Sequence, residues 1–173
     1  MICTMGRTEY TTSGDSTATM QIPTIMVLDL SEDISWITPT AADLNRGYAS
    51  KSASTSFVIN SNANWKVTIS AQGGTSGANE YFLLDSTTST LPVTALHWKS
   101  HLMDAGDMDS TTVHDTAWID FNDDGTCPTN VVEGGPGGEA QFIMDYKIDV
   151  DWKTPPSDGQ SYTVTLIYTL EAN

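Results

Sequence analysis

The residues with the most specific chemical pattern are Asp120, Asn122, Asp124 and Gly125, which stand in the run Asp-Phe-Asn-Asp-Asp-Gly. In a calcium-binding loop, side-chain oxygens at the first, third and fifth positions converge on the hard cation, and glycine at the sixth allows the sharp turn. The twelfth position, where such a loop carries a bidentate glutamate, is Val131. We therefore expect a weakly bound calcium ion, held by Asp120, Asn122 and Asp124 together with another acid. The alternative is a turn that these side chains stabilise without an ion.

The histidines form a weaker pattern. His97 and His101 would share one face of a helix, but residues 93–98 have the composition of a strand, in which positions four apart lie roughly 13 Å from each other. The chain contains no zinc-binding motif, nucleophile elbow or nucleotide-binding fingerprint. We therefore predict that the protein is not an enzyme, and a zinc hydrolase that uses His97 and His101 is the minority hypothesis.

The five tryptophans would suit a platform for sugar rings if several were exposed on one face. Trp65 and Trp152, however, are in phase with the apolar positions of predicted strands. This phase favours their burial in a core.

The charge of the chain excludes several classes of partner. The 173 residues include 22 acidic and 7 basic side chains, so the formal net charge is −15. Affinity for nucleic acid depends on Lys and Arg that displace counterions from phosphates, so no nucleic-acid partner is expected. No apolar run approaches the roughly 20 residues of a membrane span, which predicts no membrane insertion of the mature form.

The compartment is predicted from composition. Residues 1–10 lack the apolar core of a signal peptide, so the chain either begins at a processed or incomplete start or is cytosolic. The abundance of Asp, Ser and Thr favours an extracellular or cell-surface protein rich in strands. Cys3 and Cys127 permit one disulfide, within a chain or between chains.

Alternating side chains predict the strongest strands near the end of the chain. Even-numbered apolar residues alternate with mostly polar ones over residues 142–152, and a second alternation spans residues 162–170 after a turn at 155–159. We expect these two segments to form an antiparallel hairpin. A second hairpin is expected from residues 55–59 and 65–69.

Shorter strands are expected at residues 35–38, 81–84, 93–98 and 116–121, a short helix at Ala41–Arg46, and a flexible glycine-rich loop at 134–138. The spacing of these elements predicts an all-β fold. It is typical of a two-sheet antiparallel sandwich of jelly-roll or immunoglobulin-like type, preceded by an extended N-terminal strand.

The most apolar stretch of the chain is residues 19–30. An extended strand would place five large apolar side chains on one face: Met20, Ile22, Met26, Leu28 and Leu30. Pro23 has no amide hydrogen, so this strand must lie at a sheet edge or interrupt its ladder. Residues 1–30 are therefore treated as a leader with a candidate donor strand, and residues 31–173 as the sandwich domain. The strand either packs into its own sandwich or completes a neighbouring copy by strand addition.

Two segments resemble secreted β-sandwich surface proteins of bacteria and archaea: Asn-Trp-Lys-Val-Thr-Ile-Ser-Ala at 64–71 and Asp-Gly-Gln-Ser-Tyr-Thr-Val-Thr-Leu-Ile-Tyr-Thr at 158–169. With its apolar N-terminal arm, the chain looks most like the TasA and archaeal bundling-pilin group. The resemblance implies a jelly-roll-like subunit, exported by a signal peptide, that polymerises by donating its N-terminal strand to the next subunit.

The expected function is therefore a structural subunit of an extracellular filament or pilus, with no cofactor other than calcium and with copies of itself as head-to-tail partners. The alternative is a cell-surface adhesin or carbohydrate-binding β-sandwich module. In that case the N-terminal strand would pair within its own sandwich, and exposed aromatic side chains or the Asp120 loop would contact the ligand.

Overall fold

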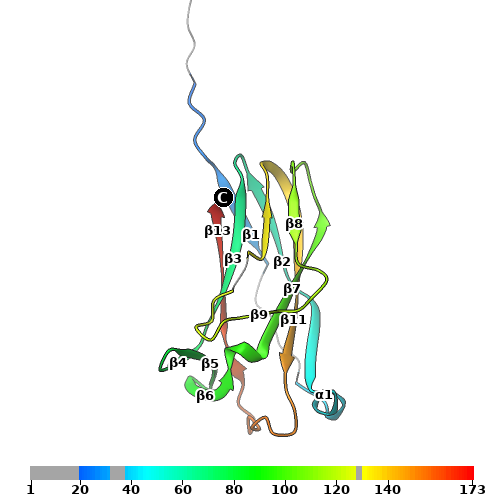
Figure 1. Cartoon of the computed structure of the whole chain (residues 1–173), viewed down its shortest axis with the longest axis vertical. Helices are drawn as coiled ribbons and strands as arrows, with labels where there is room; N and C mark the ends of the chain where they lie inside the picture. The colour runs from blue at the N-terminus through cyan, green and yellow to red at the C-terminus, as the bar shows by residue number, and fades with distance from the viewer. Residues whose placement is uncertain (1–19, 32–37, 128–129) are drawn as a thin grey trace, which may run out of the picture.

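Antiparallel strands make up most of the computed structural model, which describes residues 20–31, 38–127 and 130–173 (Figure 1). Sheet A contains, from edge to edge, β1 (Met26–Leu30), β2 (Tyr48–Ser61), β11 (Gly137–Asp149), β7 (Leu96–Asp104) and β9 (Ile119–Asp120). Sheet B contains β13 (Thr165–Ala172), β3 (Trp65–Gln72), β10 (Val132–Gly134) and β8 (Thr111–Val113). Sheet C contains β12 (Tyr162–Thr163), β5 (Asn79–Leu84) and β4 (Gly74–Ser76), and β6 (Thr87–Pro92) also pairs with β5.

Sheets A and B face each other across one apolar core. The Trp65 ring of β3 meets the Phe142 ring of β11 edge-on, with 5.8 Å between ring centres. Phe57 of β2 stacks on Phe142 at 5.4 Å and lies 5.8 Å from Tyr168 of β13. Since each strand turns alternate side chains inward, these inner faces cover each other and exclude water. The predicted all-β antiparallel sandwich is confirmed, and the jelly-roll or immunoglobulin-like topology stays a prediction.

The predicted alternation is also confirmed in the strands that build the core. Trp65, Val67, Ile69 and Ala71 of β3 are buried, and so are Ala140, Phe142, Met144 and Tyr146 of β11. The polar residues between them face outward. Residues 81–84, expected as a strand, lie within β5.

Both predicted hairpins are wrong. β11 pairs with β2 and β7 in sheet A, whereas β13 pairs with β3 in sheet B. β2 and β3 also lie in opposite sheets, so their short connection crosses from one sheet to the other. Alternation identifies the face that a strand buries, but it does not identify the strand that lies beside it, and both inner faces of a sandwich are apolar.

The glycine-rich loop predicted at 134–138 is shorter than expected, because Gly134 ends β10 and Gly137 begins β11, which leaves only residues 135 and 136 between the strands. The Trp65 indole Nε1 donates a hydrogen bond of 2.7 Å to the Gly135 carbonyl. A Cβ on Gly134 would lie 2.5 Å from the Trp65 ring. Glycine is therefore required here by the close approach of a buried ring.

Several element boundaries differ from expectation. Residues 93–95 form the 3-10 turn η1 (Val93–Ala95), so the strand expected at 93–98 begins only at Leu96. The strand expected at 116–121 is reduced to β9. Residues 35–37 of another expected strand lie outside the described residues, and Thr38 is not in a strand. Short apolar runs predict burial more reliably than strand length.

The helix α1 (Ala41–Arg46) begins and ends where the sequence predicts. The Thr40 side chain accepts a hydrogen bond from the Asp43 amide, and the Asp43 carboxylate accepts one from the Thr40 amide, which is a capping box. Gly47 ends the helix in the left-handed conformation, with φ of 89°. No helix of the described residues is long and apolar enough to cross a membrane.

A pair of tyrosines joins the two main sheets inside the core. The hydroxyls of Tyr146 in β11 and Tyr168 in β13 are hydrogen-bonded to each other. Burial raises the pKa of Tyr168 from its ordinary value of 10.0 to about 12 and also raises the pKa of Tyr146 well above 10.0. The folded protein therefore keeps both hydroxyls protonated at a pH where an unfolded chain would ionise them.

We predict that these tyrosines make the protein sensitive to alkali. Because the pKa values are higher in the folded state, their contribution to stability is complete below pH 10 and is lost as the pH rises toward 12. Tyr168→Phe should cost about 1 kcal/mol at neutral pH through the lost hydrogen bond. It should also reduce the fall in unfolding free energy between pH 9 and pH 11, measured by urea denaturation. A variant whose stability falls as steeply as that of the wild type would contradict this assignment.

Candidate functional site

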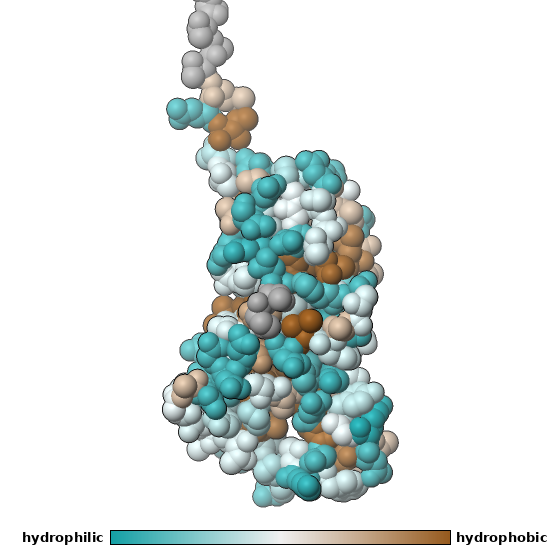
Figure 2. Space-filling model, viewed as in Figure 1, coloured by the Kyte–Doolittle hydropathy of each residue, from teal (hydrophilic) through white to brown (hydrophobic). Residues whose placement is uncertain are grey.

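An apolar segment projects from the sandwich where the described chain begins. Residues 20–25, here called the arm, leave the upper end of the molecule in Figure 1, and brown apolar atoms are visible on them in Figure 2. Met20 is 79% exposed, Ile22 69% and Ile25 55%. No residue of the arm carries a charge. Such a row of exposed apolar side chains is typical of a surface that binds another molecule.

The base of the arm is held by Asn62, which follows β2. The Asn62 side-chain oxygen accepts a hydrogen bond of 2.7 Å from the Ile25 amide, and its amide nitrogen donates one of 2.8 Å to the Pro23 carbonyl. The Asn62 backbone N–H also donates to the Ile25 carbonyl. The arm is therefore oriented along the direction of β1 where it leaves the sheet.

The five residues of the candidate donor strand lie in two places. Met26, Leu28 and Leu30 belong to β1, which pairs with β2 at the edge of sheet A. Met26 and Leu28 pack against the core of their own sandwich, whereas Met20 and Ile22 stand outside it. The part of the strand that is available to another molecule is therefore the arm.

A second apolar feature lies at the other end of the sandwich. Here a cavity of about 670 Å³ opens between α1, β5, β6, the end of β11 and the chain that leads to β12. Its apolar wall includes Leu44, Phe82, Leu91, Ile148 and Val150. In Figure 1 these elements form the lower end, opposite the arm. We call this cavity the lower pocket.

Trp152 forms part of the rim of the lower pocket and is 66% exposed. The predicted burial of Trp152 is therefore wrong. The alternation of β11 ends at Asp149, where the chain turns away from sheet A, so the core no longer determines which way later side chains point. Trp65, by contrast, is fully buried as predicted.

Hydrogen bonds brace the rim of the lower pocket. The Trp152 indole Nε1 donates to the Asn45 side-chain oxygen at 2.8 Å, which joins the 151–161 connection to α1. The Tyr162 hydroxyl donates to the Pro155 carbonyl at 3.0 Å. These bonds hold the two sides of the opening in place.

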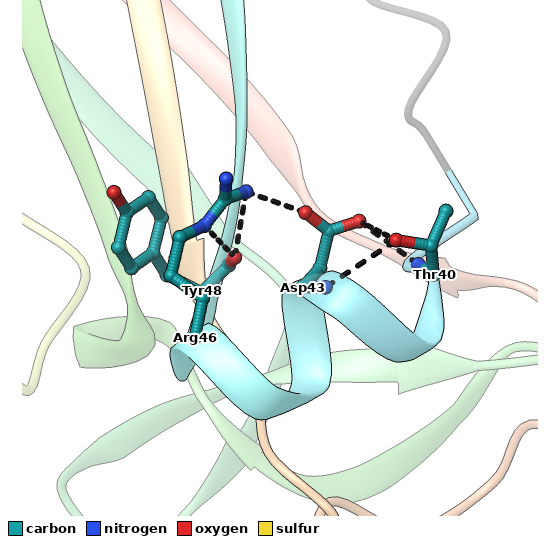
Figure 3. Close-up of polar contacts among 4 residues, drawn as sticks. All are labelled: Thr40, Asp43, Arg46 and Tyr48. Carbon is teal, nitrogen blue, oxygen red and sulfur yellow. Dashed lines mark hydrogen bonds and ion pairs between the residues drawn. The ribbon is translucent and has the colours of Figure 1, made fainter.

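The helix side of the pocket is fixed by the contacts in Figure 3. Arg46 forms an ion pair with Asp43 and donates to the Tyr48 carbonyl, which links α1 to the start of β2. Hydrogen bonds from Thr40 lower the pKa of the Asp43 carboxyl, and the nearby Arg46 lowers it further. This link places Leu44 on the wall of the pocket.

The Asp120 loop is arranged as an internally bonded turn. Asp120 Oδ1 lies 2.5 Å from His97 Nδ1, and the Asp124 carboxylate accepts hydrogen bonds from the Thr126 amide and hydroxyl. Asn122 donates its side-chain amide to the same hydroxyl. Among the described residues, no three His, Cys, Asp or Glu side chains are placed to hold a metal ion. The calcium ion stays a prediction.

The histidines have separate carboxylate neighbours. His97 is nearly buried, with Asp120 on one ring nitrogen and Asp149 Oδ2 3.0 Å from the other. His101 Nε2 lies 3.0 Å from Asp145 Oδ2. Both residues lie on β7, four positions apart on a strand. Each ring is thus engaged by its own carboxylates, and the two histidines do not form a common site.

An aromatic and basic cluster lies on the outer face of sheet A. Lys99 Nζ lies 4.7 Å from the centre of the Trp118 ring, and Lys147 Nζ lies 5.8 Å from it. Lys147 also lies 5.6 Å from the centre of the Tyr48 ring. The two ammonium groups thus lie over the ring of half-buried Trp118, where cation–π attraction holds them.

One of the two cysteines, Cys127, lies within the described residues. Cys127 is half-buried and packs against the core, whereas Cys3 lies outside the described residues. The disulfide between Cys3 and Cys127 stays a prediction.

Comparison of the sequence with known proteins found no match. No protein-family model matches the chain, and no curated protein matches it. The resemblance to the TasA and archaeal bundling-pilin group therefore stays a prediction.

The lower pocket was not predicted from the sequence. Its walls come from elements far apart in the chain, and its members belong to no motif. The one available signal was the run Trp-Lys-Thr-Pro-Pro at 152–156, which places a tryptophan inside a turn, where no strand can bury it. The arm, in contrast, was visible as an apolar stretch.

We predict that calcium stabilises the protein through the Asp120 loop. At about 10 mM calcium, an ion with a Kd of about 1 mM would add about 1.4 kcal/mol to the unfolding free energy. Asp120→Asn combined with Asp124→Asn should abolish this increment, while Asp158→Asn, in an exposed turn away from the loop, should retain it. Thermal unfolding with and without calcium measures the effect. An equal increment in all three proteins would exclude the loop as the binding site.

Proposed function

We propose that the protein is a structural subunit of an extracellular filament, which assembles head to tail through its N-terminal arm. The observation that supports the proposal most strongly is the arm itself: uncharged, apolar, exposed and held by Asn62 in an orientation that leads away from the sandwich. An isolated subunit gains nothing from keeping Met20 and Ile22 in water. Burial in a neighbouring copy would stabilise each by about 1.5–3 kcal/mol.

The mode of assembly proposed is strand donation, because the arm is already extended and continues the line of β1. An extended segment can add backbone hydrogen bonds to a sheet edge while its alternate side chains enter apolar sites. Repetition of one contact between two different surfaces produces an open fibre rather than a closed ring.

The net charge of −15 sets the conditions for assembly. Like-charged subunits repel each other, and this repulsion weakens as dissolved salt screens it over about 10 Å at 0.1 M ionic strength. An arm without charge adds nothing to the repulsion at the contact. Calcium and high salt should therefore both favour the polymer.

A second candidate function is a cell-surface adhesin or carbohydrate-binding module. The observation that favours it is the cluster of Tyr48 and Trp118 with Lys99 and Lys147 on the outer face of sheet A. Aromatic rings that lie flat on a sheet can stack on sugar rings. Loss of polysaccharide binding in Trp118→Ala, with no effect of Ile22→Asp, would favour this function over the filament.

We predict that Ile22→Asp reduces polymer formation at least tenfold at equal protein concentration and about 0.5 M salt, because a carboxylate replaces an apolar group that must be buried. The melting temperature of the monomer should not change, since Ile22 is exposed. Light scattering and negative-stain electron microscopy measure the polymer.

The matched control is Gln21→Asp, which adds the same charge to the adjacent position and, in an extended segment, on the opposite face. This control should polymerise at near wild-type levels. Polymer formation by Ile22→Asp that equals that of Gln21→Asp and of the wild type would refute a role for the arm.

A further inference from the structure

The arm and the lower pocket lie at opposite ends of the molecule. The arm leaves the end that also carries the C-terminus, and the lower pocket lies between α1, sheet C and the end of β11 (Figure 1). Each copy therefore offers one projecting apolar segment and one apolar recess. Two such copies, placed end to end, bring the arm of one to the pocket of the other.

The size of the lower pocket suits a short peptide segment. Its volume of about 670 Å³ is in the range of cavities that enclose most of a small ligand, roughly 300–1,000 Å³. The arm has six residues, so it spans roughly 20 Å when extended. Met20 and Ile22 lie about 7 Å apart on one face of such a strand, and two neighbouring side chains can enter one recess.

The charges of the two surfaces also match. The arm carries no charge, and the lining of the pocket, within the described part of the chain, includes one acid, Asp151, and no base. A basic or acidic peptide would gain little from such a wall and would lose its hydration on entry. An uncharged apolar segment is the occupant that this lining accommodates at least cost.

The pocket is open and its rim is already braced. Trp152 is held over the rim by Asn45, and Leu44 lies on the wall without belonging to the core of the sandwich. The ordering of side chains that binding usually requires is therefore small here. An exposed tryptophan at the mouth of a recess is typical of an anchor that a partner covers.

We propose that the lower pocket is the acceptor for the arm of a second copy, with Met20 and Ile22 entering beside Leu44 and Trp152. The proposal rests on the proposed filament function and specifies which surface receives the arm. The contact joins two different surfaces at opposite ends of the subunit. Its repetition extends the chain of subunits along the long axis of the sandwich.

The decisive experiment mixes two deficient full-length variants. Ile22→Asp blocks the arm and leaves the pocket intact, whereas Leu44→Asp blocks the pocket and leaves the arm intact. Each alone should form at least tenfold less polymer than the wild type at about 0.5 M salt. An equimolar mixture should form a dimer and nothing longer, because only one arm and one pocket remain functional. Size-exclusion chromatography with light scattering measures the mass.

Each variant has a control at a nearby residue. Gln21→Asp adds the same charge to the other face of the arm. Ala42→Asp adds it to an exposed position of α1 that does not line the pocket. Both controls should polymerise like the wild type, and circular dichroism should show that all four variants are folded.

The outcomes separate the two proposals. If Leu44→Asp polymerises like the wild type while Ile22→Asp does not, the arm still drives assembly but the lower pocket is not its acceptor. If the wild type forms no polymer at any salt or calcium concentration, the filament function is refuted and the acceptor site with it.

A second measurement does not depend on the folding of Leu44→Asp. A photo-crosslinking amino acid at position 20, in an otherwise wild-type chain, should form intermolecular crosslinks to peptides that contain residues 38–47 or 150–162. Crosslinks confined to the sheet edges, at β8, β9 or β1, would overturn the lower pocket as acceptor.

Discussion

The structure depends on the mutual burial of the inner faces of sheets A and B. Each sheet needs the other as a cover, because β3 and β11 bury alternate apolar side chains and β2 adds Phe57 and Ile59 to the same core. Trp65 against Phe142 forms the centre of this contact, and the tyrosine pair Tyr146 and Tyr168 completes it. Face-to-face packing covers the faces of a sandwich but leaves its ends to loops. The arm and the lower pocket lie at those ends.

The two ends are built differently. At the upper end β1 finishes the edge of sheet A, and among the described residues the arm before it belongs to no strand. At the lower end, Ile148 of β11 and Val150 just after it line the lower pocket together with residues of α1, β5 and β6. This recess is therefore enclosed by short elements from distant parts of the chain.

Charge bears on the proposed contact between these ends. Copies with a net charge of −15 repel each other, and Lys99, Lys147 and Arg46 are engaged within the molecule by rings, a carboxylate or a backbone carbonyl. The arm carries no charge, so the proposed contact would bring few carboxylates together. Repulsion elsewhere on two copies would then disfavour other modes of association.

The amino-acid sequence by itself determined the class of the fold, the inward face of the core strands, the position of α1 and the apolar character of the arm. These are local properties, each decided within a few positions: the alternation of side chains, the helix start at Thr40 and helix end at Gly47, and a run of uncharged apolar residues. Tertiary structure alone decided that β11 and β13 lie in opposite sheets, that Gly134 makes room for the Trp65 ring, and that Trp152 stands at the rim of a pocket. The physical reason is that strand partners and cavity walls come from residues far apart in the chain. Several pairings bury the same apolar faces, and only the packing of the whole molecule selects one.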